Sequence, residues 1–417
     1  MQANFIPNRR RDILLLVFSI VGIVALAGRG IYLAIMGFTS ISFTSTTDLT
    51  SNIFGAIGMF FCTTLLLPLL IYCIRKLNGK EIRTAKLPPV KFWHVAGLLG
   101  AWVFIIILGS IFNALPKYAW LMALPFFLLG IAMPVAGLAW IAIGGLPAGS
   151  WRRMWAAFAI GMTGSTVGAM LLEYSLVGIA ALAAEIVAAS NPEWLAIFQQ
   201  VRNQVTNAGD VQSLLTTLAP YLTNPLVLLL ALVFAAILAP IIEETLKPAA
   251  VWLLGKRLHS PAEGFALGAL CGAGFALLEG TLAASGGSQM LGVGLAARAT
   301  SSLMHITASG LMGWGIASAR LEKRYGRLAG VYLLSVSIHG LWNGSVILSV
   351  FGALRFTLPG AGSDLLGMLL VLTGIGILVS MLVTIMILLP IINHRLRPKP
   401  PAADAPSQSD IIAPLQP

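Results

Sequence analysis

Long uninterrupted apolar blocks constrain this chain more than any other feature of its sequence. Each block can supply the ~20 residues that cross the ~30 Å hydrocarbon core of a bilayer. The blocks lie approximately at residues 13–36, 53–74, 93–114, 119–146, 155–186, 225–255, 262–284, 299–319, 328–350 and 365–390. Only 10% of the residues are charged, which is too few for the exterior of a soluble protein of this length. The sequence therefore predicts an all-α, polytopic membrane helical bundle of about ten transmembrane helices.

The placement of Lys and Arg predicts which ends of the spans face the cytoplasm. With the N-terminus inside, nearly all basic residues of the connections fall on the inner side. Arg29 lies within the first span, and the outer connections hold only Lys117, Arg202, Arg298 and Arg355. This skew is the positive-inside pattern. It predicts a multi-pass protein of the cell membrane with both termini cytoplasmic and its basic residues beside anionic lipid. The cations are shared among separate segments, so we expect no nucleic-acid partner.

The same pattern divides the chain into consecutive parts. They are a basic cytoplasmic arm (1–12), a five-helix membrane region (13–186), an extracytoplasmic loop (187–224), a four-helix core (225–350), a final transmembrane helix (351–397) and a disordered tail rich in Pro and Ala (398–417). Apolar residues recur at helical spacing within the loop, first as Leu195, Phe198 and Val201, then as Leu214, Leu215, Leu218 and Leu222. The loop is therefore predicted to form two amphipathic helices on the outer surface.

Ionisable residues inside the spans mark the candidate site, because they are costly in a membrane and commonly functional. Most of them lie between residues 243 and 343. Glu243 and Glu244 are adjacent in the sixth span, and Lys247 follows at a spacing that lets it pair with either. Glu279 lies in the seventh span on the same face as Phe275. Taken alone, the Glu pair with Lys247 could also form an interfacial salt bridge, and Glu279 could also form a hydrogen bond to a neighbouring helix.

The two following spans add histidines to this set. His305 lies in the eighth span, and His339 lies in the ninth with Asn343 one turn further on the same face. At 1.5 Å per residue, these groups and the carboxylates can reach a similar depth. The long sixth span would then tilt or break at a proline, either Pro240 or Pro248. Glu, His and Asn in four consecutive spans therefore predict one shared site.

This set of residues suits hydrolysis of a carbonyl compound inside a membrane. A carboxylate beside imidazoles can activate water as a general base, with or without a metal ion. An Asn side chain can donate to a developing oxyanion. The same groups could also relay protons in a proton-coupled membrane transporter, and a membrane scaffold is a third alternative. Composition and spacing do not choose among these functions.

Four motifs in sequence order carry a family resemblance. They are Glu243-Glu244-x-x-Lys247, Phe275-x-x-x-Glu279, His305 and His339-x-x-Trp342-Asn343. This order resembles the PrsW family of intramembrane proteases and is more distantly similar to CAAX prenyl endopeptidases and bacteriocin-processing relatives. The resemblance covers roughly residues 235–350. It implies an intramembrane endopeptidase that hydrolyses a peptide bond of a membrane-anchored protein.

The resemblance also implies roles for the motif residues. Glu243, with Glu244, would polarise the attacking water, and Lys247 would neutralise the pair. His339 and Asn343 would stabilise the tetrahedral oxyanion.

His305 would be a second catalytic or substrate-orienting group, and Glu279 would hold an imidazole or share in water activation. Members of the family are described both as metalloproteases and as metal-independent glutamic proteases. Whether the protein binds a divalent metal such as zinc therefore stays open. The possible ligands are Glu243, Glu279, His305 and His339, and no organic cofactor is expected.

Overall fold

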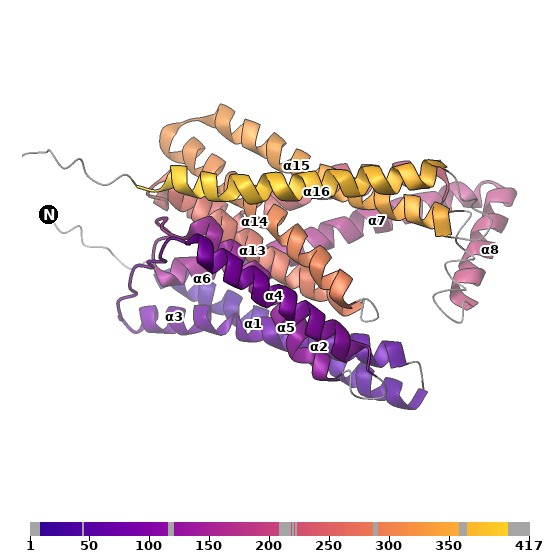
Figure 1. The fold of residues 1–417 in the computed structure, drawn as a ribbon, viewed down its shortest axis with the longest axis horizontal. Coiled ribbons are helices and arrows are strands. Elements are labelled where there is room, and N and C mark those ends of the chain that lie inside the picture. Colours follow the sequence, from indigo (N-terminus) through magenta and orange to yellow (C-terminus); the bar gives the residue numbers. More distant parts are fainter. Residues whose placement is uncertain are drawn as a thin grey trace, which may run out of the picture.

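A bundle of long helices makes up the computed structural model of this chain (Figure 1). The structure describes residues 9–43, 46–115, 121–207, 223–286, 291–357 and 365–398, together with residues 218 and 221. Within these ranges the only β-type pairing is an isolated bridge between Thr84 and Ser150. Nine of the described segments are long and apolar enough to cross a membrane. The predicted all-α polytopic membrane bundle is therefore confirmed.

The first five spans comprise helices of unequal length. They are α1 (Arg9–Phe43), α2 (Thr46–Thr64), α3 (Leu67–Leu77), α4 (Phe92–Asn113), α5 (Leu124–Ile143), α6 (Trp151–Ala159), the π-helical turn η2 (Ile160–Ser165) and α7 (Thr166–Ala189). Helices α2 and α3 together form one span, as do α6, η2 and α7. Pro68 lies in the first turn of α3, where its missing N–H would have no helical partner in any case.

The sixth span is broken near its candidate site residues. It contains α10 (Pro225–Leu232), the π-helical turn η3 (Val233–Leu238), α11 (Ala239–Leu246), α12 (Ala249–Leu254) and the short 3₁₀ helix η4 (Gly255–Arg257). The gap between α11 and α12 falls at Lys247 and Pro248, one of the two prolines predicted to break the span. A proline inside a helix removes a backbone hydrogen bond and clashes with the preceding turn. Lys247 therefore lies at the C-terminal end of α11.

The eighth predicted span, α14 (Leu291–Glu322), forms a continuous helix that is less apolar than the other nine spans. Most of its middle is buried, including the polar residues Ser302, His305 and Ser309. Neighbouring helices shield this surface from lipid, so α14 does not need an apolar exterior. The prediction of about ten spans thus corresponds to nine apolar spans and α14.

Glycines bring α13 (Pro261–Gly286) into close contact with α14. A Cβ atom added to Gly268 would lie 2.3 Å from the carbonyl oxygen of Ser309, and one added to Gly272 would lie 2.5 Å from that of His305. Only glycine permits such a close approach of two helix backbones. The glycine repeat therefore fixes the part of α14 that carries His305.

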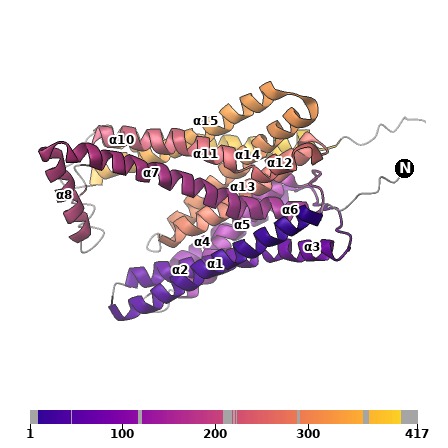
Figure 2. The ribbon, with the colours of Figure 1, turned by 180° about the vertical axis from the view of Figure 1, so that it is seen from behind.

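The pair α13–α14 lies in the middle of the bundle (Figures 1 and 2). Helices α1 to α5 lie on one side, and α15 (Tyr325–Thr357) with α16 (Leu365–Leu396) lies on the other. The start of α1 and the end of α16 lie at the same end of the bundle, as an even number of crossings requires. The cytoplasmic location of that end stays a prediction.

The connection at residues 187–224 contains α8 (Pro192–Asn207), which crosses the opposite end of the bundle (Figure 1). This helix corresponds to the first of the two predicted amphipathic helices. Several sequence predictions lie outside the described residues: most of the basic arm (1–8), Lys117, Leu214, Leu215 and Leu222 of the second amphipathic helix, and nearly all of the predicted tail (399–417).

Candidate active site

Lys247 is the centre of the predicted cluster. Its ammonium nitrogen Nζ is fully buried and lies 2.9 Å from Glu243 Oε2 and 2.7 Å from Glu244 Oε1. The same atom lies 2.7 Å from Nδ1 of His305 on α14 and 3.3 Å from Nδ1 of His339 on α15. One ammonium group therefore connects both carboxylates of α11 with both imidazoles.

His339 is oriented from two sides. Its Nδ1–H donates to Glu244 Oε1 at 2.9 Å, and its Nε2 accepts from Nδ2 of Asn343 at 3.2 Å. Asn343 Nδ2 also donates to the carbonyl oxygen of Ala235 in η3 at 2.9 Å. The π-helical turn thus anchors Asn343, and Asn343 in turn holds the imidazole. Nε2 of His339 lies 3.7 Å from Glu243 Oε2.

His305 is oriented by Glu279 of α13. Nε2 of His305 lies 3.0 Å from Glu279 Oε2, so the Nδ1 atom faces Lys247. Glu279 Oε1 accepts a hydrogen bond from Arg298 at 3.1 Å. The His305 ring also packs against Phe275, with ring centroids 5.5 Å apart. A chain of three side chains therefore fixes the second imidazole.

The two adjacent carboxylates differ in their surroundings. Glu244 is fully buried and bonds to both Lys247 and His339. Glu243 is 8% exposed, and its Oε2 atom receives no well-directed hydrogen bond although the ammonium of Lys247 lies nearby. The Oε2 atom of Glu244 likewise receives no well-directed hydrogen bond, so the two carboxylates differ in their exposure and in the two bonds that hold Glu244 Oε1.

Two residues of the cluster were not assigned to it from the sequence. Arg298 was placed in an outer connection, yet it lies on α14 two turns before His305 and bonds to Glu279. The seven-residue spacing, which puts two helical residues on one face, was the available signal. Glu173 of α7 lies close enough to Glu243 for their carboxylates to interact electrostatically. No local pattern indicates that α7 packs against α11.

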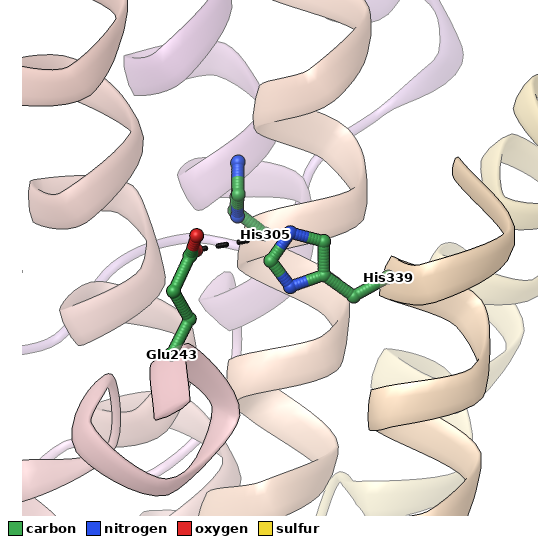
Figure 3. Close-up of side chains that lie close together, drawn as sticks. All are labelled: Glu243, His305 and His339. Carbon is green, nitrogen blue, oxygen red and sulfur yellow. Dashed lines mark ion pairs between the residues drawn. The ribbon is translucent and has the colours of Figure 1, made fainter. Parts of the chain in front are cut away.

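Three of the residues could hold a metal ion. Glu243, His305 and His339 each offer a ligand atom, and these atoms lie within 4.8 Å of one another (Figure 3). Two imidazoles and a carboxylate are a common ligand set of catalytic zinc. The residue types and their convergence thus fit zinc, but the ammonium of Lys247 contacts all three groups and would compete with an ion.

Glu279, also predicted as a possible ligand, is not in this group of three. It lies beyond His305, bonded to the ring nitrogen that faces away from Lys247. A carboxylate in that position typically orients a histidine ligand and fixes its tautomer.

A family model matches the part of the chain that contains this cluster. The model of the PrsW family of intramembrane metalloproteases matches residues 149–375, more than half of the 417-residue chain. The matched region contains every residue of the cluster, including Glu173 and Arg298. No curated protein and no solved structure matches the chain.

Proposed function

Because this chain belongs to the PrsW family of intramembrane metalloproteases, we propose that it hydrolyses a peptide bond of a membrane-anchored protein through the cluster around Lys247. The observation that carries this proposal is the difference between the two adjacent carboxylates. Glu244 is fully buried and its Oε1 accepts from both Lys247 and His339, whereas Glu243 is 8% exposed and is the carboxylate that converges with His305 and His339. Each carboxylate keeps one oxygen without a well-directed hydrogen bond. A buried carboxylate with a spare acceptor is suited to take a proton from water.

Glu243 is the proposed general base. It removes a proton from a water molecule while the water oxygen attacks the carbonyl carbon of the substrate. Nε2 of His339 is the nearest imidazole nitrogen to Glu243, at 3.7 Å. We propose that the proton passes to the leaving amide nitrogen by way of Glu243 and His339, so that the peptide bond breaks as the nitrogen is protonated.

His339 and Asn343 are the proposed donors to the tetrahedral oxyanion. When His339 is protonated at Nε2, that nitrogen donates and no longer accepts from Asn343, so one Nδ2 hydrogen of Asn343 is also freed to donate to the oxyanion. Because Asn343 is bonded to Ala235 O and to His339, it also positions the imidazole. Donors fixed before the reaction stabilise a developing charge without reorganisation.

A divalent metal such as zinc would be held by Glu243, His305 and His339. When bound, it would polarise the substrate carbonyl and activate the attacking water. Glu279 and Arg298 would keep His305 oriented for this role, because they fix the opposite side of its ring. Lys247 must then turn away from the three ligands, since its ammonium lies among them.

The proposed substrate is a protein anchored in the same membrane, which we take to be the cell membrane because of the skewed distribution of Lys and Arg. The test is a proteome-wide comparison of membrane-protein fragments from cells that express the wild-type chain or the Glu243→Gln variant. We expect specific fragments with the wild type alone. Identical fragments in both cultures, at equal protein levels, would contradict a role for Glu243. A pH-driven solute flux without any cleavage would instead favour a transporter.

A further inference from the structure

A cavity lies at the end of the bundle where α1 starts. It has a volume of about 540 Å³ and is lined by residues of α1, α6 with η2, and α12 with η4. Its four arginines are Arg11, Arg152, Arg153 and Arg257. They lie at or just beyond the ends of three different spans. None of the lining residues belongs to the cluster around Lys247.

The charges of the cavity are not balanced. Arg152 pairs with Asp12, and Arg153 pairs with Glu263, whose oxygen lies 2.6 Å from the guanidinium. Neither Arg11 nor Arg257 forms an ion pair with any described residue. The positive charges of Arg152, Arg257 and Arg153 repel that of Arg11, and the attraction by Asp12 is shared with Arg152, the ion-pair partner of Asp12. The cavity therefore keeps two uncompensated guanidiniums that would be stabilised by an anion.

The rest of the lining is apolar and extends toward the lipid-facing surface. Leu14 and Leu253 line the cavity and are 68% and 73% exposed, which suits contact with hydrocarbon. Phe18 lies one turn beyond Leu14 on the same helix. An inorganic anion would contact the arginines alone, whereas an anionic lipid would contact both the arginines and the apolar part of the lining. The combination of charged and apolar linings therefore indicates a ligand with an anionic head and hydrocarbon chains.

We propose that this cavity binds one anionic glycerophospholipid, with its phosphate between Arg11 and Arg257 and its acyl chains along Leu14 and Leu253. Basic pockets between transmembrane helices recognise such headgroups through charge, while the chains stay in the bilayer. The lining includes Ala249 and Ala250, which closely follow Lys247. A lipid bound here therefore contacts the segment that continues from the candidate active site.

The test is native mass spectrometry of the full-length protein titrated with phosphatidylglycerol, or with phosphatidylcholine of the same acyl chains. Preferential binding of phosphatidylglycerol is expected. Arg11→Ala and Arg257→Ala should each weaken it about fivefold, the equivalent of ~1 kcal/mol for one basic residue beside an anionic lipid. Arg320→Ala is the matched control, because Arg320 is an exposed arginine at the end of α14, outside the cavity.

Three results would overturn the proposal. The first is equal binding of phosphatidylglycerol and phosphatidylcholine. The second is a loss of phosphatidylglycerol binding in Arg320→Ala as large as in the Arg11→Ala and Arg257→Ala variants. The third is full displacement of the lipid by inorganic phosphate, which would show that the acyl chains contribute nothing. The thermal unfolding midpoint of each variant is measured as well. A midpoint equal to that of the wild type would show that the variant is folded and that only lipid binding is lost.

Discussion

Helices α13 and α4 are both transmembrane spans, but they differ in their surroundings and in the side chains that they carry. Inside the protein, 89% of the α13 span is buried, against 11% of the α4 span. The α4 helix meets lipid and carries no ionisable group in its interior, whereas α13 carries Glu279 and contacts the helix that holds His305. Shielding from lipid lowers the cost of polar side chains in a span. The comparison teaches that burial of the individual group matters more than the polarity of its span, because Glu243 and Glu244 are also buried although their span is the most apolar of the nine.

The largest expected difference between the two helices is in the free energy of unfolding after a glycine in each is replaced by alanine. Gly268→Ala on α13 places a Cβ atom 2.3 Å from a backbone oxygen of α14, so the two helices must move apart. We expect a loss of about 3 kcal/mol in the free energy of unfolding, as in severe overpacking. Gly100→Ala on α4, where a Cβ meets nothing within 4 Å, should be neutral or slightly stabilising. If reversible unfolding measurements show that both variants are destabilised equally, the difference in packing between α13 and α4 would be refuted.

Histidines in the two regions should differ in their effect on cleavage. His339→Ala removes an imidazole that bonds to Glu244 and faces Glu243, and it should lower the rate about 10²–10⁴-fold. His94→Ala, at the exposed start of α4, should leave the rate unchanged. Cleavage assays of both variants in the same membranes test this. A similar rate in the two variants would remove His339 from the proposed mechanism.

Glu279→Gln tests whether the carboxylate on α13 positions His305. Orienting groups of this kind typically contribute 10–100-fold to metal affinity or activity. We expect a loss of that size in zinc affinity, measured by competition with a chelating dye, and a partial recovery in Glu279→Asp. Unchanged zinc affinity together with unchanged cleavage would make Glu279 a packing residue only.

Lys247→Met tests whether the ammonium competes with a metal ion. Its Nζ atom lies among the three candidate ligand groups, so its removal should tighten zinc binding by about tenfold, or ~1.4 kcal/mol. Dye competition on purified protein measures this independently of cleavage. Weaker zinc binding in a folded variant would show that Lys247 supports the ligands and does not compete.

The sequence was sufficient to predict the spans and the motif residues, because an ionisable group in an apolar helix is conspicuous. It also predicted that the sixth span tilts or breaks at Pro240 or Pro248, since a proline interrupts the helical hydrogen bonds, and the structure has the break at Pro248. The partners Glu173 and Arg298 were not predicted, because their roles depend on which helices pack together. The contacts of Lys247 were predicted only in part. Its spacing from Glu243 and Glu244 indicated that it can pair with these carboxylates. Its contacts with both imidazoles depend on the folded positions of α14 and α15.

Cleavage by purified, reconstituted protein tests the central claim most directly, with a substrate taken from the fragment comparison. The wild type is compared with Glu243→Gln and with Glu185→Gln, an exposed carboxylate of α7 outside the cluster. The account predicts that Glu243→Gln lowers the rate about 10²–10⁴-fold without loss of fold, and that Glu185→Gln cleaves at the wild-type rate. Cleavage by Glu243→Gln at the wild-type rate would contradict it.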